Sequence, residues 1–123
     1  DLICQCENHQ EFENLIKDKF GNEKEFKSSS HMRYGKKSTI VKFKVQDFEI
    51  EIFGQNTPSL QQNAYRHMII EHGILEEKGK EFREKVLELK LQGLKTEPAF
   101  AQLLGLEGDP YKQLLLLEDL GEK

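Results

Sequence analysis

The 123-residue sequence lacks any apolar run of the length that crosses a bilayer. A membrane-spanning helix needs about 18 or more largely uncharged apolar residues, and the longest apolar clusters, at residues 68–70 and 114–117, are far shorter. We therefore expect no transmembrane helix and no membrane partner. The first residues contain neither a Met nor the basic and apolar regions of a secretory leader, so we expect further residues upstream of Asp1.

Cysteine is also scarce, because Cys4 and Cys6 are the only two in the chain. Their spacing of two residues would strain a disulfide, so we expect free thiols that pack in the core rather than act as nucleophiles. Two cysteines without a second pair do not supply the usual ligand set of a zinc site. Reduced thiols are typical of a cytoplasmic protein, and the cytoplasm is the location that we expect.

Motifs of several enzyme classes are missing as well. The chain has no Gly-x-Ser-x-Gly elbow, no Walker A loop and no glycine pattern of a dinucleotide site. His67 and His72 are five residues apart, about 140° around a helix, and so do not form a metal-binding pair on one face. His9 and His31 have no ligand partner in the sequence. These absences disfavour catalytic zinc.

Acidic residues outnumber basic ones, 22 to 18, and the formal net charge is −4. This balance disfavours a general nucleic-acid coat protein, which gains affinity from a basic surface, but it leaves nucleic acid open as a partner. Residues 27–46, however, contain six basic residues and no acidic one. Two interpretations stay open: a local face that attracts anions, or a hairpin kept soluble by lysines at its edges. The six are Lys27, Arg33, Lys36, Lys37, Lys42 and Lys44.

The first half of the chain alternates in the manner of β-strands. Residues 1–6 predict a strand, and a helix is expected to follow from the capping residue Asn8 to a stop at Gly21. Residues 26–34 predict a weaker strand, closed by a turn at residues 35–37. Residues 39–45 and 48–53 alternate strictly, and a two-residue turn between them would form a hairpin. The pairs expected in it are Val45 with Phe48, Phe43 with Ile50, Val41 with Ile52, Lys44 with Glu49, Lys42 with Glu51 and Ile40 with Phe53.

After Gly54 the apolar spacing changes from two residues to three or four, which predicts helices. A first helix is expected to begin at Thr57 and Pro58, with Gly73 as a candidate interruption. Further helices are expected at residues 80–92, at residues 96–104 and after Asp109. The expected buried stripes are Leu60, Ala64, Tyr65, Met68 and Ile69 in the first helix, Phe82, Val86 and Leu89 in the second, and Leu114, Leu117 and Leu120 in the last.

These elements predict an α+β fold in a single domain of residues 1–123. A small mixed or antiparallel sheet would occupy residues 1–55, and helices residues 56–123. The polar face of that sheet offers carboxylates on adjacent strands, which suit magnesium near a phosphate. The alternative is that the same residues form ordinary cross-strand charge pairs, each worth about 0.2–1 kcal/mol. The residues in question are Asp1, Glu49, Glu51, Lys42 and Lys44.

Four sequence blocks resemble a bacterial family of unknown function within the nucleotidyltransferase superfamily. They are FEIEIFGQ at residues 48–55, QNAYRHM at 62–68, GLKTEPAFA at 93–101 and LEGDPY at 106–111. Enzymes of that superfamily carry a Gly-Ser turn, two carboxylates two residues apart on one strand, and a third carboxylate on a nearby strand. Asp1 resembles the second carboxylate and Glu51 the third, and the turn and the first carboxylate would lie upstream.

The resemblance implies a nucleotidyltransferase-like fold and a metal-dependent reaction. A nucleoside monophosphate would be transferred from a nucleoside triphosphate to a hydroxyl acceptor that the sequence does not identify. Mg²⁺ would be the cofactor, because carboxylates of this kind hold two ions against the triphosphate. Asp1 and Glu51 would be the catalytic metal ligands, with Glu49 in reserve.

Three basic residues would contact the nucleotide: Lys42 on the sheet, and Arg66 and Lys95 in the later blocks. His67, next to Arg66, would line the same acceptor or nucleotide pocket. The alternatives are that Lys42 only neutralises Glu51 and that Arg66 forms a surface ion pair. A second interpretation of the whole protein is a catalytically inactive module of the same fold that senses a nucleotide or binds a partner. Gly-Ser and an acidic residue just before Asp1 would favour the enzyme over the module.

Overall fold

The computed structural model describes residues 1–118 and has the predicted α+β composition. The chain forms two compact units, Asp1–Gln62 and Asn63–Lys123, and each is described here by itself. The sheet unit contains β1 (Leu2–Gln5), α1 (His9–Phe20), β2 (Lys24–Arg33), β3 (Lys36–Val45), β4 (Phe48–Gln55) and the short 3₁₀ helix η1 (Ser59–Gln61). The helical unit contains α2 (Asn63–Lys78), α3 (Lys80–Leu91), α4 (Thr96–Leu104) and α5 (Pro110–Leu115).

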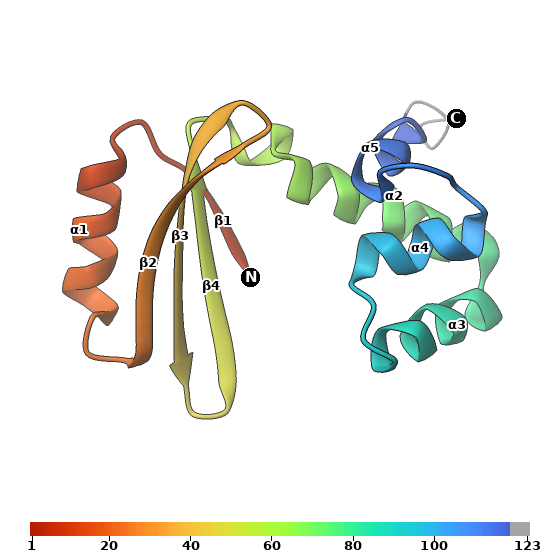
Figure 1. Ribbon diagram of the computed structural model, residues 1–123, viewed down its shortest axis with the longest axis horizontal. Coiled ribbons are helices and arrows are strands. Elements are labelled where there is room, and N and C mark those ends of the chain that lie inside the picture. The colour runs from red at the N-terminus through yellow and green to blue at the C-terminus, as the bar shows by residue number, and fades with distance from the viewer. Residues whose placement is uncertain (119–123) are drawn as a thin grey trace. The chain divides into compact units, whose positions relative to one another are not determined.

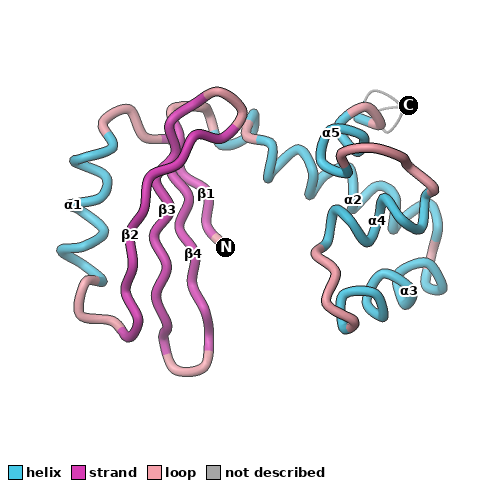
Figure 2. The backbone as a smooth tube through the Cα atoms, in the orientation of Figure 1, coloured by secondary structure: helices cyan, strands magenta, loops and turns pink. Residues whose placement is uncertain are grey.

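The sheet of the first unit has four strands in the order β1-β4-β3-β2 (Figure 2). β1 runs parallel to β4, whereas β4, β3 and β2 are antiparallel neighbours. The sheet is therefore mixed, which is one of the two arrangements that the sequence left open. α1 lies along one side of the strands (Figure 1), and its Ile16 is buried in one core with Val41, Phe43 and Ile52. This arrangement leaves the opposite face of the sheet without α1.

The predicted hairpin is confirmed in all its pairs. Val45 is the partner of Phe48, Phe43 of Ile50, Val41 of Ile52, Lys44 of Glu49, Lys42 of Glu51 and Ile40 of Phe53. Because side chains alternate along a strand, this register sends Phe43 toward α1 and Lys42 to the opposite face. Phe43 stacks on Phe20 of α1 with ring centroids 4.9 Å apart. The register thus separates an apolar face from a polar one.

The start of α1 follows from its capping residue. The Asn8 side chain accepts a hydrogen bond of 3.0 Å from the backbone N–H of Glu11, which satisfies one of the free donors of the first turn. The helix ends before Gly21, as predicted. The apolar residues that it buries lie on one stripe, so the amphipathic pattern alone sets which side meets the sheet.

The predicted turn at residues 35–37 needs correction at its boundaries. The turn between β2 and β3 is at Tyr34 and Gly35, both with positive φ, and Lys36 and Lys37 belong to β3. A two-residue turn whose residues both have positive φ matches the twist of the strands it joins. The lysines are therefore paired strand residues and not part of a loop.

The helical unit departs most from the sequence prediction in its first helix. Thr57 and Pro58 lead into η1, and α2 begins only at Asn63 and continues through Gly73 without interruption. Its buried residues are His67 and Ile70. The expected stripe was wrong, because Leu60, Met68 and Ile69 are 68%, 53% and 48% exposed. The apolar residues of this segment lie on more than one side of the helix, so their spacing does not specify which side is buried. In the folded unit the buried side is the one that contains His67 and Ile70.

The remaining helices agree with the sequence. α4 has the expected bounds, and α3 and α5 begin where they are expected. Asp109 caps α5 by accepting a hydrogen bond of 2.9 Å from the N–H of Tyr111. The core of this unit consists of Val86, Ala99, Phe100 and Leu114. Leu120, expected on the last stripe, lies outside the described residues. No helix within residues 1–118 has the length and apolar character needed to span a membrane.

Candidate functional site

The face of the sheet opposite α1, here called the open face, carries the predicted carboxylates. Leu2 of β1 is the register partner of Ile52 of β4, and the two strands are parallel. Asp1 directly precedes Leu2 just as Glu51 directly precedes Ile52, so Asp1, at the start of β1, adjoins Glu51, in the middle of β4. Glu51 is half-buried, whereas Asp1 is exposed.

Glu49 and Lys42 share the open face with Glu51. Alternation along β4 places Glu49 two residues before Glu51, and Lys42 is the partner of Glu51 on β3. Within residues 1–118, no ion pair within 4.0 Å joins Lys42 to Glu51 or Lys44 to Glu49. The cross-strand pairs that the sequence offered as an alternative are thus register neighbours without being ion pairs.

Lys44 pairs elsewhere. Its ammonium nitrogen lies 3.2 Å from a carboxylate oxygen of Glu25. Glu25 has a positive φ of 57° and sits where the β2–β3 register shifts between Lys24 and Lys27. A bulge changes the direction of the side chains beside it. Here the Glu25 carboxylate reaches the ammonium of Lys44, whose register partner on β4 is Glu49.

Two carboxylates from adjacent strands fit magnesium in their chemistry. Mg²⁺ prefers oxygen ligands and is usually held by one or two carboxylates together with substrate phosphates and water. Asp1 and Glu51 offer such oxygens on one face of the sheet. Within the described part of the chain, no three His, Cys, Asp or Glu side chains are grouped as metal ligands. The face therefore offers a pair of carboxylates, which suits a metal that is shared with the phosphates of a substrate.

Two buried glutamines support the open face, and sequence reasoning missed both. Gln55 donates from Nε2 to Ser38 Oγ at 3.0 Å and to the Arg33 carbonyl at 3.3 Å, which fixes the end of the β2–β3 hairpin. Gln62 donates from Nε2 to the carbonyls of Cys4 and Thr57 at 2.9 and 3.0 Å. These contacts fasten β1 and the segment after β4 to each other. Gln55 and Gln62 stand at the end and the start of two blocks that suggest the resemblance, but nothing in the pattern shows that they are buried.

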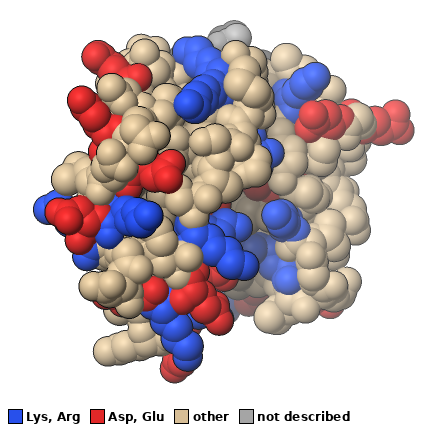
Figure 3. Space-filling model, turned by 60° about the vertical axis from the view of Figure 1, so that its left-hand side comes forward, with Lys and Arg blue, Asp and Glu red and all other residues tan. Residues whose placement is uncertain are grey.

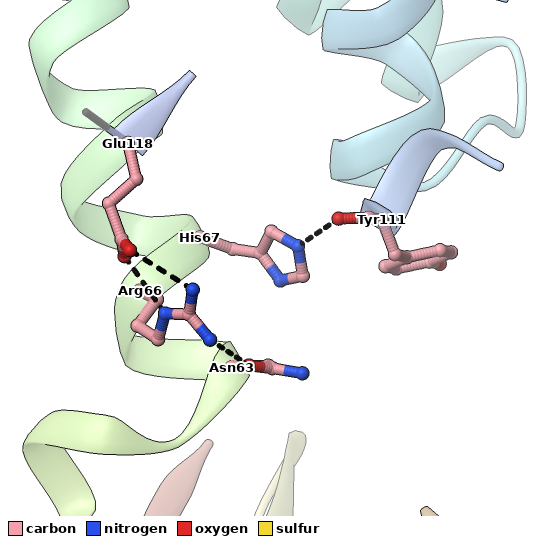
Figure 4. A network of polar contacts seen from close by, with 5 residues as sticks. All are labelled: Asn63, Arg66, His67, Tyr111 and Glu118. Carbon is pink, nitrogen blue, oxygen red and sulfur yellow. Dashed lines mark hydrogen bonds and ion pairs between the residues drawn. The ribbon is translucent and has the colours of Figure 1, made fainter. Parts of the chain in front are cut away.

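Arg66 and His67 lie in the helical unit, in a network between α2 and the end of the chain (Figure 4). The Arg66 guanidinium binds both carboxylate oxygens of Glu118, at 2.9 and 3.0 Å, and donates to Asn63 Oδ1 at 2.9 Å. The ion pair that the sequence left open for Arg66 is therefore present. The Arg66 hydrogen bonds lower the pKa of Glu118 from its ordinary value, because they favour the charged carboxylate.

His67 performs a packing role in the same network. Its Nε2–H donates to the Tyr111 carbonyl at 2.8 Å, and the two rings meet edge to face at 5.8 Å. The hydrogen bond lets a polar ring be buried on the core side of α2. Lys95, the third predicted nucleotide contact, is exposed directly before α4. Arg66 and Lys95 thus belong to the helical unit, and Lys42 to the sheet unit.

The helical unit also holds a carboxyl pair that the sequence did not indicate. Burial, the charge of Glu97 and a hydrogen bond with Glu97 raise the pKa of Glu71 to about 8, and Lys90 opposes this shift. One Glu71 oxygen, Oε2, is buried without a hydrogen-bond partner. Glu71 is on α2 and Glu97 on α4, so only the packing of helices reveals the pair.

Both cysteines are free thiols, as predicted. Cys4 packs against the core beneath α1, and Cys6 is buried. Burial raises the pKa of both thiols, and for Cys6 the neighbouring Cys4 adds to the effect. Since the thiolate is the nucleophilic form, the raised pKa favours packing over catalysis. Cys6 Sγ lies 3.6 Å from His9 Nδ1, which is 2.8 Å from Thr39 Oγ1.

The sequence matches a domain of unknown function, DUF4269, over residues 1–117. The chain belongs to the DUF4269 family. It matches no curated protein and no solved structure. The predicted membership of a family of unknown function is thereby confirmed. The description of DUF4269 states no activity, so the link to nucleotidyltransferases rests on the four sequence blocks and is carried into the proposal that follows.

Proposed function

We propose that this DUF4269 protein is a metal-dependent nucleotidyltransferase with its catalytic carboxylates on the open face of the sheet. The observation that carries the proposal is the β1–β4 register, in which Asp1 and Glu51 adjoin on parallel strands. Paired carboxylates on neighbouring strands are the arrangement that phosphoryl-transfer sites use to hold divalent cations. Of the two carboxylates, Asp1 is exposed and Glu51 is half-buried.

Each residue has a distinct part in the proposed reaction. Asp1 and Glu51 would hold Mg²⁺, with Glu49 in reserve, and the bound ion would neutralise phosphate charge in the transition state. Lys42, beside Glu51, would contact a phosphate of the nucleotide. Arg66 and Lys95 belong to the helical unit, where Arg66 is paired with Glu118, and the proposed reaction uses residues of the sheet unit.

The proposed reaction conserves atoms and charge in a simple way. The acceptor hydroxyl oxygen forms a bond to the α-phosphorus of the nucleoside triphosphate. The bond from that phosphorus to the β-phosphate oxygen breaks, and pyrophosphate leaves. The hydroxyl proton is released to water. The chain's residues orient the two reactants in line, which is the main contribution that a protein makes to this chemistry.

The test is thermal denaturation of the full-length protein with each nucleoside triphosphate, with and without magnesium. A triphosphate at about 100 times its dissociation constant should stabilise the fold by about 2.7 kcal/mol. We expect this stabilisation to require magnesium and to be lost in Glu51→Gln. The matched control is Glu23→Gln, an exposed carboxylate in the turn after α1, which should leave it unchanged.

Four outcomes separate the interpretations. Loss of binding in Glu51→Gln but not in Glu49→Gln or Glu23→Gln supports the site as proposed. Loss in Glu49→Gln alone would show that the wrong carboxylate was chosen. Magnesium-dependent binding without release of pyrophosphate, with any acceptor supplied, would favour the second interpretation, a nucleotide-sensing module. Nucleotide binding that is unchanged in Glu51→Gln, Glu49→Gln and Glu23→Gln would overturn the proposal.

A further inference from the structure

The open face carries a row of basic residues on β2 and β3 whose register places like charges side by side. Lys27 is the partner of Lys42, and Arg33 is the partner of Lys36. Like charges directly opposite each other in a sheet are destabilising. All four side chains are exposed, and together they are called the basic row.

Little within the protein compensates this charge. Residues 27–46 contain no acidic residue. Within residues 1–118, the ion pairs include none from Lys27, Arg33, Lys36 or Lys42. Lys36 donates one hydrogen bond of 3.0 Å to the neutral hydroxyl of Thr57. Glu51 lies beside Lys42 in the register, but the paired like charges of the row exceed this one negative charge, which indicates an anionic partner from outside.

Strand register, and not net charge, identifies this surface. On the face that Figure 3 shows, acidic and basic side chains are intermingled, in keeping with the small net charge of −4. Cross-strand pairing, by contrast, collects basic residues from two segments of the sequence on one side of one hairpin. An overall acidic chain can therefore still carry a local anion-binding surface.

We propose that the basic row binds single-stranded nucleic acid. Lys27 and Arg33 are six residues apart on β2, so the row extends for about 20 Å at roughly 3.3 Å per residue. That length suits several consecutive phosphates of an extended strand rather than one small anion. His31 and Ser29, joined by a hydrogen bond of 2.9 Å, lie between them on the same face and offer further polar groups.

A stacking residue stands at one end of the row. Tyr34, in the turn that joins Arg33 to Lys36, has a positive φ and is 60% exposed. An aromatic ring beside a basic groove is the combination with which proteins bind single strands, because the bases stack on the ring while the phosphates meet the cations. An acidic peptide would use the cations but not the ring.

A membrane surface fits this hairpin less well. Binding to lipid requires apolar side chains that enter the bilayer beside the basic ones. On this face the residues between the cations are Ser29, His31 and Ser38, and the apolar Ile40 is buried. The single apolar residue exposed on β2, Met32, is opposite Lys37 and points to the other face. The pattern therefore favours a nucleic acid.

The inference goes beyond the proposed function and does not require it. Lys42 of the row adjoins Glu51, so a bound strand would pass beside the proposed carboxylates and its end would be a suitable hydroxyl acceptor. Contacts from lysine and arginine to phosphate, however, need no divalent cation. Binding measured in a chelator thus tests the basic row even if the magnesium site fails.

The experiment is fluorescence anisotropy with the full-length protein and a labelled oligouridylate of about 12 nucleotides, within the usual range of single-strand sites. Affinity is measured in chelator between about 50 and 200 mM salt. Four phosphate contacts predict a slope of log K against log salt of about −2.8, at about −0.7 for each contact. The double variant Lys27→Gln with Lys42→Gln removes two of these contacts, so its slope should be less steep by about 1.4.

The matched control is Lys17→Gln with Lys19→Gln, which removes the same charge from the exposed side of α1. It should keep the slope of the unaltered protein. Tyr34→Ala should lower the affinity at least about fivefold through lost stacking and leave the slope unchanged. These two results together distinguish a site for nucleic acid from general attraction to anions.

Several results would overturn the proposal. One is equal weakening by the two double variants, because the effect would then follow net charge only. Another is an unchanged affinity in Tyr34→Ala with equally tight binding of inorganic polyphosphate, which would indicate a polyanion site without base stacking. Absence of binding at about 50 mM salt would also refute it. A circular dichroism spectrum for each variant confirms that the fold is intact.

Discussion

Glu71 shows how the packing of helices changes the acidity of one residue. Its carboxyl group is partly buried on α2, next to Glu97 of α4, and its pKa is raised from 4.5 to about 8. The charged groups that face it are Glu97, which raises the pKa, and Lys90 of α3, which lowers it. The pair thus joins two helices most favourably when one of the carboxyl groups keeps its proton.

This raised pKa has a definite consequence for stability. The folded chain retains a proton at Glu71 that the unfolded chain releases above about pH 4.5, so the free energy of unfolding should fall as the pH rises toward 8. We expect Glu71→Gln to remove this loss, because the amide is neutral at every pH. The variant should exceed the unaltered protein in stability at pH 8 to 9 and approach it near pH 4.5.

Urea denaturation over this pH range is the measurement, with Glu76→Gln as the control. Glu76 is exposed on the same helix, so its replacement should shift stability equally at all pH values, and by little. If the free energy of unfolding of Glu71→Gln differs from that of the unaltered protein by the same amount at every pH, as expected for Glu76→Gln, the pKa of Glu71 is not raised in the folded protein.

At the scale of elements, the packing of α1 on the sheet depends on one close approach. Gly54 of β4 lies beneath the Phe12 ring of α1, and a Cβ at residue 54 would come within 2.7 Å of Phe12 Cζ. Gly73, in the middle of α2, has no atom within 4 Å of such a Cβ. The two glycines therefore differ in the space around them, although both lie inside regular elements.

Replacing each glycine by alanine should give opposite results. Gly54→Ala forces a methyl group into the ring of Phe12 and should lower the free energy of unfolding by about 1–3 kcal/mol. Gly73→Ala improves helix propensity in open space and should raise it by about 0.5–1 kcal/mol. Chemical denaturation of both variants is the measurement. A loss at Gly73, or no loss at Gly54, would contradict the packing described.

At the scale of the molecule, the chain has two separate cores. Phe43 is buried with Val41 and Ile52 in the sheet unit, and Phe100 with Leu114 in the helical unit. Each core is formed by residues of its own unit. A defect in one core should therefore be felt first within that unit.

We expect Phe43→Ala and Phe100→Ala each to cost about 3–5 kcal/mol. In hydrogen exchange, Phe43→Ala should reduce protection in β2, β3 and β4, and Phe100→Ala in α3, α4 and α5. Mass spectrometry of peptic fragments resolves the two. Equal loss of protection over both units in either variant would show that the chain unfolds as one cooperative body.

Local patterns allowed much of this structure to be predicted. The β3–β4 register, the cap at Asn8 and the bounds of α4 were all predicted from alternation, capping residues and helical spacing, because these signals act between residues close in the chain. The α+β class followed from their order. The sequence also suggested the carboxylates of the candidate site, since alternation alone puts Glu49 and Glu51 on the face opposite Ile50.

Tertiary structure decided what depends on contacts between distant segments. In the folded protein α2 buries His67 and Ile70, whereas Met68 and Ile69 are exposed. Lys44 forms its ion pair with Glu25 and not with its register partner Glu49. The tertiary structure also sets β1 parallel to β4, which brings Asp1 beside Glu51. A helix with apolar residues on several sides, or a strand with two possible neighbours, does not specify its partner locally. The choice is made by the total burial and hydrogen bonding of the folded chain.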